Sequence, residues 1–187
     1  MITFTVSEMV EIAGRYDSLL GKPASDDDIK RCNEAIGRES GSDYIASLRS
    51  GLGSKSGGTA KKLYIPDDYA GFLRLANGYA YNGYFFYGTK ELLEREGGFC
   101  LPGIPEVNEG AGMYEKIPDG FIVVGRHVFD DVFDDVYAYD TGSRKYYVFE
   151  RGSDDYGDPF DSFESLFTSE VNIHPGSSEI WGPEDVF

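Results

Sequence analysis

The chain has 187 residues, 41% of them hydrophobic and 15% aromatic, which is enough for one folded domain with a substantial core. This composition argues against a disordered chain. With no heptad repeat, no regular glycine spacing and no 18-residue apolar run, the sequence also excludes a coiled coil, collagen and a membrane span.

The formal net charge is −16, from 33 acidic and 17 basic residues, and residues 118–187 alone carry 16 acidic and 4 basic groups. Such a surface repels phosphate backbones, so we expect no direct binding to nucleic acid. The acidic excess either serves solubility or steers a basic partner towards the protein.

Cys32 and Cys100 are the two cysteines, and neither belongs to a CxxC motif or a Cys/His cluster. That pattern is typical of reduced thiols in a cytoplasmic protein. Residues 1–6 contain neither a basic region nor a long apolar run, so we expect no secretory signal. The sequence therefore predicts a cytoplasmic protein without a membrane partner.

The N-terminal part, residues 1–50, is predicted to form short helices. Thr5 and Glu8 have the spacing of a capping box, and apolar residues recur on one helical face from there to Leu20. Ser25, followed by three aspartates, marks the start of a second helix, because carboxylates in the first turn complement the helix dipole.

A third short helix is expected at residues 44–48. Residues 51–60 are rich in Gly and Ser, the composition of a flexible loop, and separate the helical part from a main α+β body over residues 61–187. Because the N-terminal part has few apolar residues, we expect it to pack on this body, so that residues 1–187 form a single domain.

A further helix is predicted to begin after Pro66 and to end at Asn77-Gly78. Proline at the first helical position loses no hydrogen bond, and Asp67 and Asp68 follow it at the positive end of the dipole. Apolar side chains at i, i+3, i+4 and i+7 then form one buried face. These are Tyr69, Phe72, Leu73 and Ala76.

Residues 79–87 (YAYNGYFFY) are predicted to form a hairpin, because Asn-Gly at its centre favours a type I′ turn. Its aromatic rings either cover a sheet face or stack on a sugar or peptide, and we favour the core interpretation. A brief helical turn is expected at residues 91–94. Residues 97–120, rich in Gly and Pro, are predicted to be irregular and to hold no central strand.

From residue 121 onward a period of two predicts strands at residues 121–125, 135–140 and 145–150, the last two joined by a turn at residues 141–144. A closing helix is predicted from the helical spacing of Phe160, Phe163, Leu166 and Phe167. Helices followed by an antiparallel meander and a closing helix predict the α+β class, with a mostly antiparallel sheet and helices packed against it.

Known catalytic motifs are missing from the sequence. GxGxxG, Walker, GxSxG and HExxH patterns are absent, and His127 and His174 lack ligand partners at zinc-site spacing. An EF-hand alignment over residues 153–164 fails where Asp158 replaces the turn glycine and Pro159 follows. We therefore expect no enzyme, no metal site and no cofactor.

IPDDY at residues 65–69, with the helix that ends in Asn77-Gly78, resembles the signature of the SUKH superfamily, bacterial immunity proteins related to fungal cell-wall-assembly regulators. The later strands and DSFESLF at residues 161–167 resemble the family's strands and closing helix. Residues 133–135, Phe-Asp-Asp, replace the family's Gly-rich turn. Residues 97–120 look like an insertion, as in a YrhA-like branch.

The resemblance implies a non-enzymatic immunity protein that binds a cognate toxin domain and blocks it. Many such toxins are nucleases, which tend to be basic because they hold phosphates, and a net charge of −16 complements them. One alternative is a glycan-handling or cell-wall-associated binding protein, or a hydrolase, that uses the Tyr/Phe-rich hairpin. Another is a regulatory scaffold that binds other host proteins.

The partner-binding site is expected in two acidic loops that flank the predicted strands. Ionised carboxylates there would form charge-assisted hydrogen bonds with a basic toxin, and aromatic rings in the same loops would be the desolvated anchors. The candidates are Phe129, Asp130, Asp131, Phe133, Asp134, Asp135, Asp154, Asp155, Tyr156 and Asp158. The alternative is a solvated acidic rim without a partner.

Overall fold

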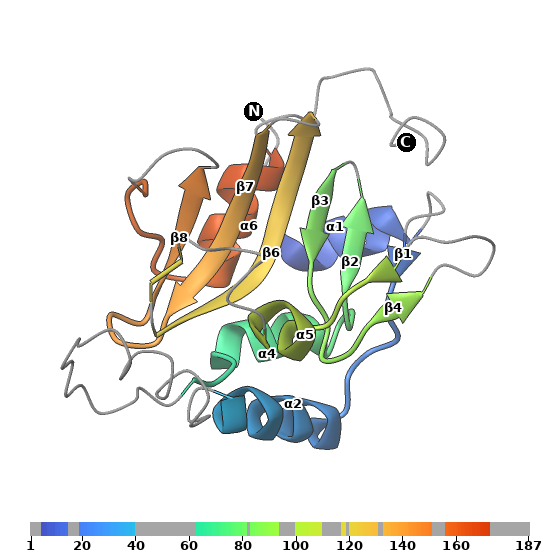
Figure 1. The fold of residues 1–187 in the computed structure, drawn as a ribbon. Helices are drawn as coiled ribbons and strands as arrows, with labels where there is room; N and C mark the ends of the chain where they lie inside the picture. The colour runs from blue at the N-terminus through green and yellow to red at the C-terminus, as the bar shows by residue number, and fades with distance from the viewer. Residues whose placement is uncertain are drawn as a thin grey trace, which may run out of the picture.

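A computed structural model gives the fold as a six-stranded antiparallel sheet with helices packed against it (Figure 1). The strand order is β1-β2-β3-β6-β7-β8. This architecture confirms the predicted α+β class. The structure describes residues 5–14, 19–39, 63–81, 83–93, 100–109, 117–118, 120–130, 133–150 and 156–172. The helix expected at residues 44–48 and the loop expected at residues 51–60 lie outside these ranges.

The helices are α1 (Val6–Ala13), α2 (Asp26–Glu39), α4 (Asp67–Leu73), α5 (Ile104–Glu109) and α6 (Phe163–Asn172). The main sheet is formed by β1 (Leu19–Leu20), β2 (Tyr79–Tyr81), β3 (Tyr84–Phe86), β6 (Phe121–Asp130), β7 (Phe133–Asp140) and β8 (Lys145–Glu150). A second, two-stranded sheet pairs β4 (Leu92–Leu93) with β5 (Cys100–Leu101).

The first helix has the predicted start but not the predicted end. Thr5 accepts the backbone N–H of Glu8 at 3.3 Å, and the Glu8 carboxylate accepts the backbone N–H of Thr5 at 2.8 Å, so the capping box is confirmed. The helix ends at Ala13, and Leu20 instead pairs with Tyr79 as part of β1. The prediction of helix up to Leu20 is wrong because backbone pairing with β2 overrides the helical spacing.

Helix α2 begins as predicted, and Ser25 and Asp28 cap its N-terminus with reciprocal hydrogen bonds. Ser25 Oγ accepts the N–H of Asp28 at 3.2 Å, and the Asp28 carboxylate accepts the N–H of Ser25 at 3.0 Å. The helix packs on α5 and buries Cys32 together with Ile29 and Ile36. Burial raises the pKa of the Cys32 thiol to about 12, so this side chain packs as an apolar group.

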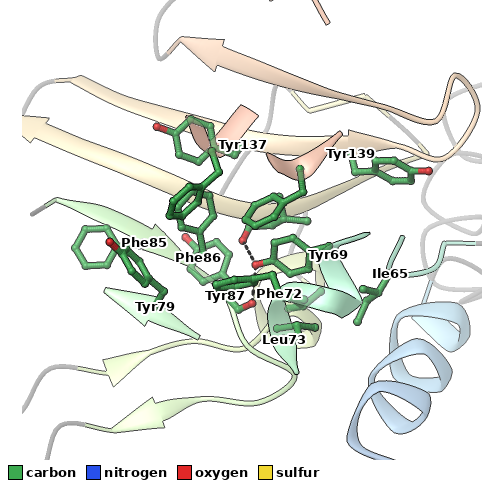
Figure 2. Close-up of a cluster of buried hydrophobic side chains, with 14 of the residues drawn as sticks. Ile65, Tyr69, Phe72, Leu73, Tyr79, Phe85, Phe86, Tyr87, Tyr137 and Tyr139 are labelled. Carbon is green, nitrogen blue, oxygen red and sulfur yellow. Dashed lines mark hydrogen bonds between the residues drawn. The ribbon is translucent and has the colours of Figure 1, made fainter. Parts of the chain in front are cut away.

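Hairpin β2–β3 supplies much of the core, as the favoured interpretation of its sequence predicted. Gly83 has a φ of +79°, the backbone conformation expected of a glycine in this turn. Tyr79, Tyr84, Phe85, Phe86 and Tyr87 are buried. Figure 2 shows Phe86 lying among the rings of helix α4 and Tyr137 of β7.

Two expectations for the middle of the chain are wrong. Residues 91–94 were expected to form a helical turn, yet Leu92 and Leu93 form β4. Residues 97–120 were expected to be irregular, yet they contain α5, in which Pro105 occupies the first turn, where no backbone N–H is needed. The Asn108 amide then accepts the N–H of Val123 at 2.9 Å and donates to its carbonyl at 3.0 Å, which fixes α5 against β6.

Helix α4 begins after Pro66 as predicted and ends at Leu73, four residues before Asn77. Gly78 has a φ of +106°, and the Asn77 side chain is paired with Thr89. The amide of Asn77 donates to Thr89 Oγ1 at 2.9 Å and accepts the N–H of Thr89 at 2.7 Å. Asn-Gly therefore stabilises the chain reversal between α4 and the hairpin through a buried polar pair.

The strands after residue 121 are confirmed, with two corrections at their ends. Strand β6 continues past Gly125 to Asp130, with a register shift between Val123 and Gly125. Phe160 does not belong to the closing helix, which begins at Phe163. Instead, Phe160 and Tyr146 exchange two backbone hydrogen bonds of 2.9 Å, so residues 156–160 run along the free edge of β8.

The carboxylate of Asp68 joins three elements that are distant in the sequence. Its Oδ1 accepts the Tyr146 hydroxyl of β8 at 2.7 Å. Its Oδ2 accepts the N–H of Phe163, the first residue of α6, at 2.7 Å. Asp68 thus fixes α4 against β8 and satisfies one of the open N–H groups at the start of α6.

Replacing Asp68 by Ala should lower the free energy of unfolding by about 3 kcal/mol, because the buried Tyr146 hydroxyl and the N–H of Phe163 lose a charged acceptor. Urea unfolding measures this change. The matched control is Asp67→Ala, one residue earlier in the same helix turn. Both residues are exposed, but of the two only Asp68 is described with hydrogen bonds to β8 and α6, so the control should cost at most about 0.5 kcal/mol. Equal losses in the two variants would contradict this role of Asp68.

Two Tyr→Phe variants compare the stability contribution of a buried hydroxyl that has hydrogen-bond partners with that of one that has none. The Tyr69 hydroxyl lies 2.8 Å from the carbonyl oxygens of Tyr87 and of Val124 (Figure 2). The Tyr79 hydroxyl is buried without a partner among the described residues. Tyr69→Phe should therefore cost about 1–2 kcal/mol, whereas Tyr79→Phe should be neutral or stabilising by up to about 1 kcal/mol. Urea unfolding of both variants tests the contrast, and a loss at Tyr79 as large as that at Tyr69 would refute it.

Candidate partner-binding surface

The ten residues predicted to bind a partner are only partly within the described structure. Asp131, Asp154 and Asp155 lie outside the described residues. The backbones of Phe129, Asp130, Phe133 and Asp134 are described, but their side chains are not. Both backbone and side chain are described for Asp135, Tyr156 and Asp158.

The first acidic segment belongs to strands over most of its length, which corrects the expectation of a loop. The β6–β7 ladder includes the pairs Val128–Asp134 and Asp130–Phe133, so only residues 131–132 lie between the two strands. The ladder extends this far because both strands continue to exchange backbone hydrogen bonds beyond Gly125. Asp135 pairs with Glu150, which places the start of β7 beside the end of β8.

Asp135 and Tyr156 lie on opposite faces of the sheet. Asp135 shares a face with Tyr137, two residues along β7, and its charge raises the pKa of Tyr84, Tyr137 and Glu170 on the side of α6. Tyr156 contacts Tyr147 and Phe149, which alternate with the inward-pointing Tyr146 of β8. The structure therefore separates these two predicted residues.

Four aromatic rings cover the outer face of the sheet at its β8 end, and we call them the ring surface. They are Phe121, Tyr147, Phe149 and Tyr156. In Figure 1 helix α6 lies behind β6, β7 and β8, so the viewer looks onto this outer face. Tyr156 is 51% exposed, and the other three rings are half-buried.

The four rings form a closed cycle of contacts. Phe121 lies 5.5 Å from Tyr147 and 5.4 Å from Phe149, while Tyr156 lies 5.1 Å and 5.3 Å from the same two rings. Three of these pairs are edge-to-face, the arrangement that aromatic quadrupoles favour. Rings this close fill the space between them, so a partner meets a continuous aromatic surface instead of a cage.

The ring surface has a rigid support. On β7, the strand between β6 and β8, Ala138 is fully buried and pairs with Tyr147, and its small side chain lets the rings meet above it. Tyr156 forms a bridge with Phe149, and Gly157 donates to the Val148 carbonyl at 3.4 Å. Tyr156 and Asp158 are therefore held on the edge of the sheet, with Asp158 exposed beside the rings.

Arg126 lies farther along the same outer face, in register with Val136 and through it with Phe149. Its guanidinium lies over the ring of Phe85, 5.2 Å from the centroid. Its Nε is buried without a hydrogen-bond partner among the described residues. This side chain places a cation on the same face of the sheet as the ring surface.

The structure also bears on a sugar-binding hairpin, a metal site and a membrane-spanning helix. The rings of hairpin β2–β3 are buried, apart from the half-buried Tyr81, so this hairpin presents no open aromatic platform for a sugar. Within the described ranges, no group of three His, Cys, Asp or Glu side chains is arranged to hold a metal ion. No helix in the described part of the chain is long and apolar enough to cross a membrane.

Comparisons of the chain with protein-family models, with curated proteins and with solved structures find no match.

Sequence reasoning identified Tyr156 and Asp158 but missed the other members of this surface. Phe121, Tyr147 and Phe149 were assigned to strands without a face. The signal that finds them is the register, because Ala138 of β7 pairs with Tyr147 while Phe149 follows two residues later on the same face. Only the pairing of β6, β7 and β8 brings Phe121 to the same place.

Proposed function

We propose that this chain is a non-enzymatic immunity protein that binds a basic toxin domain through the ring surface. The observation that carries the proposal is the closed cycle of four aromatic rings, including the half-exposed Tyr156, on the outer face of a protein with a net charge of −16. The resemblance of IPDDY and of the following helix to the SUKH signature supports the same function.

Aromatic rings on a rigid sheet are suitable anchors for a protein interface. Tyrosine and phenylalanine bury a large area at a small entropic cost, and binding hot spots are enriched in such rings. Because residues 156–160 already pair with β8, a partner is expected to contact side chains here instead of adding a strand.

The charge of the protein favours a basic partner in two ways. The overall negative field accelerates association with a positively charged surface by about 10–10³-fold. At short range, the faces of the rings attract guanidinium and ammonium groups, while the exposed Asp158 accepts hydrogen bonds from them.

The test is binding to the toxin domain encoded beside the gene for this protein, measured as association and dissociation rates at low and high salt. The double substitution Phe149→Ser and Tyr156→Ser should weaken binding at least about tenfold, mainly through faster dissociation, because it removes the desolvated anchors. The salt dependence should remain, because this variant keeps every charge.

The matched control is Leu75→Ser together with Leu93→Ser. Leu75, just after the C-terminus of α4, is 47% exposed, and Leu93 of β4 is 60% exposed. Both side chains lie away from the ring surface. This control should bind like the wild type. Wild-type affinity in a ring-surface variant that is still folded would refute the proposed site, and absence of binding in the wild type would refute the proposed function.

A further inference from the structure

A cluster of titratable side chains lies between the C-terminal half of α6 and the inner face of the sheet, opposite the ring surface. We call it the Glu170 cluster. Its members are Tyr84 of β3, His127 of β6, Asp135 and Tyr137 of β7, and Glu170 of α6. Tyr84, His127 and Tyr137 are buried, while Asp135 and Glu170 are half-buried.

The contacts of the cluster hold α6 to the sheet near the end of the helix. The Tyr84 hydroxyl donates to the backbone carbonyl of Glu170 at 3.0 Å, and the Tyr137 hydroxyl lies 3.5 Å from the Glu170 carboxyl oxygen Oε2. The rings of Tyr84 and His127 stack with centroids 4.0 Å apart and planes 4° apart. Cross-strand pairing places Tyr84, His127 and Asp135 in one row.

The electrostatics of this site disfavour a second negative charge. Burial raises the pKa of Glu170, and the carboxylate of Asp135 raises it further, while the hydrogen bond from Tyr137 opposes these effects. Burial also raises the pKa of Tyr84, to about 12, and that of Tyr137. Both hydroxyls therefore keep their protons and remain donors over the physiological pH range.

Apart from His127, which belongs to the cluster, no cation among the described residues shifts the pKa of Glu170. The buried face of α1, which packs on α6, is formed by Val6, Met9 and Ala13. Glu170 is also the third residue from the C-terminus of α6, where the negative end of the helix dipole disfavours another negative charge. Burial, the neighbouring carboxylate and the dipole thus act in the same direction.

We propose that the C-terminal turn of α6 is a pH-dependent latch, which is held on the sheet while Glu170 carries a proton and loosens when Glu170 and Asp135 are both charged. In the docked state Glu170 binds its proton more tightly than a solvated glutamate, whose ordinary pKa is 4.5. Docking is therefore strongest below that ordinary value and weakens as the pH rises through the higher value of the docked state.

Amide hydrogen exchange measures the latch directly. The readout is the protection factor of residues 168–172, corrected for intrinsic exchange at each pH between 4 and 8, with amides at the centre of β6 as the internal reference. Within the window between the two pKa values of Glu170, protection of this turn should fall about tenfold for each pH unit, because one proton is linked to opening. The β6 amides should not follow.

Three substitutions distinguish the latch from a general loss of stability. Glu170→Gln should keep the turn protected at all pH values, because its amide is neutral and can still accept the Tyr137 hydroxyl. Asp135→Asn should shift the loss of protection to lower pH, because the like charge that raises the pKa of Glu170 is gone. Glu164→Gln, exposed in the first turn of the same helix, should behave like the wild type.

The proposal is overturned if protection of the wild-type turn does not change with pH, if Glu170→Gln retains the wild-type pH dependence, or if the β6 amides lose protection in parallel with the turn. A pH-dependent loss confined to α6, abolished by Glu170→Gln and displaced by Asp135→Asn, supports it.

Discussion

The carboxylate of Asp68 is the contact on which the inner half of the structure depends. One side chain at the start of α4 accepts the hydroxyl of Tyr146 and the first N–H of α6, so it sets the position of both helices relative to β8. With that geometry fixed, the Tyr69 and Phe163 rings meet edge to face at 4.8 Å, and the Phe72 and Phe163 rings lie 5.1 Å apart. Each of these hydrogen bonds is directional, whereas the ring contacts alone would permit several arrangements of similar energy.

The positions of α4 and α6 also determine which side chains lie on the outer face of the sheet. Because α4 and α6 both pack on the inner face, the alternate side chains of β8 point away from the helices, and Tyr147 and Phe149 are left to pack on Phe121 and Tyr156. The chain protects its sheet edge with residues 156–160, which removes the risk of edge pairing while leaving the rings accessible. An aromatic surface held by backbone pairing on both sides is already ordered before a partner arrives, which lowers the entropic cost of binding.

Local signals predicted those parts of the fold that local interactions determine. The capping box of α1, the start of α2 at Ser25, the start of α4 after Pro66 and the Asn-Gly hairpin each depend on residues within a few positions of one another. Leu20 and Leu92 were assigned to helices because two-residue strands have no period of their own, and only a distant partner makes them strands. The ring surface could not be predicted for the same reason. Both faces of β8 are aromatic or aliphatic, so its sequence does not tell which face the helices cover.

The two faces give the acidic residues of one strand pair different physical roles. Asp135 looks equivalent to its neighbours in the sequence, but the period of two places it with Tyr137, inside the Glu170 cluster and away from Tyr156. Neutralising Asp135 therefore changes the proton affinity of Glu170 and the docking of α6. Neutralising Asp158 changes only the exposed field near the rings. A charge substitution that includes both would mix a change in fold with a change in steering. Electrostatic steering towards the ring surface is therefore properly assessed with Asp158, because Asp135 is half-buried on the opposite face, beside α6.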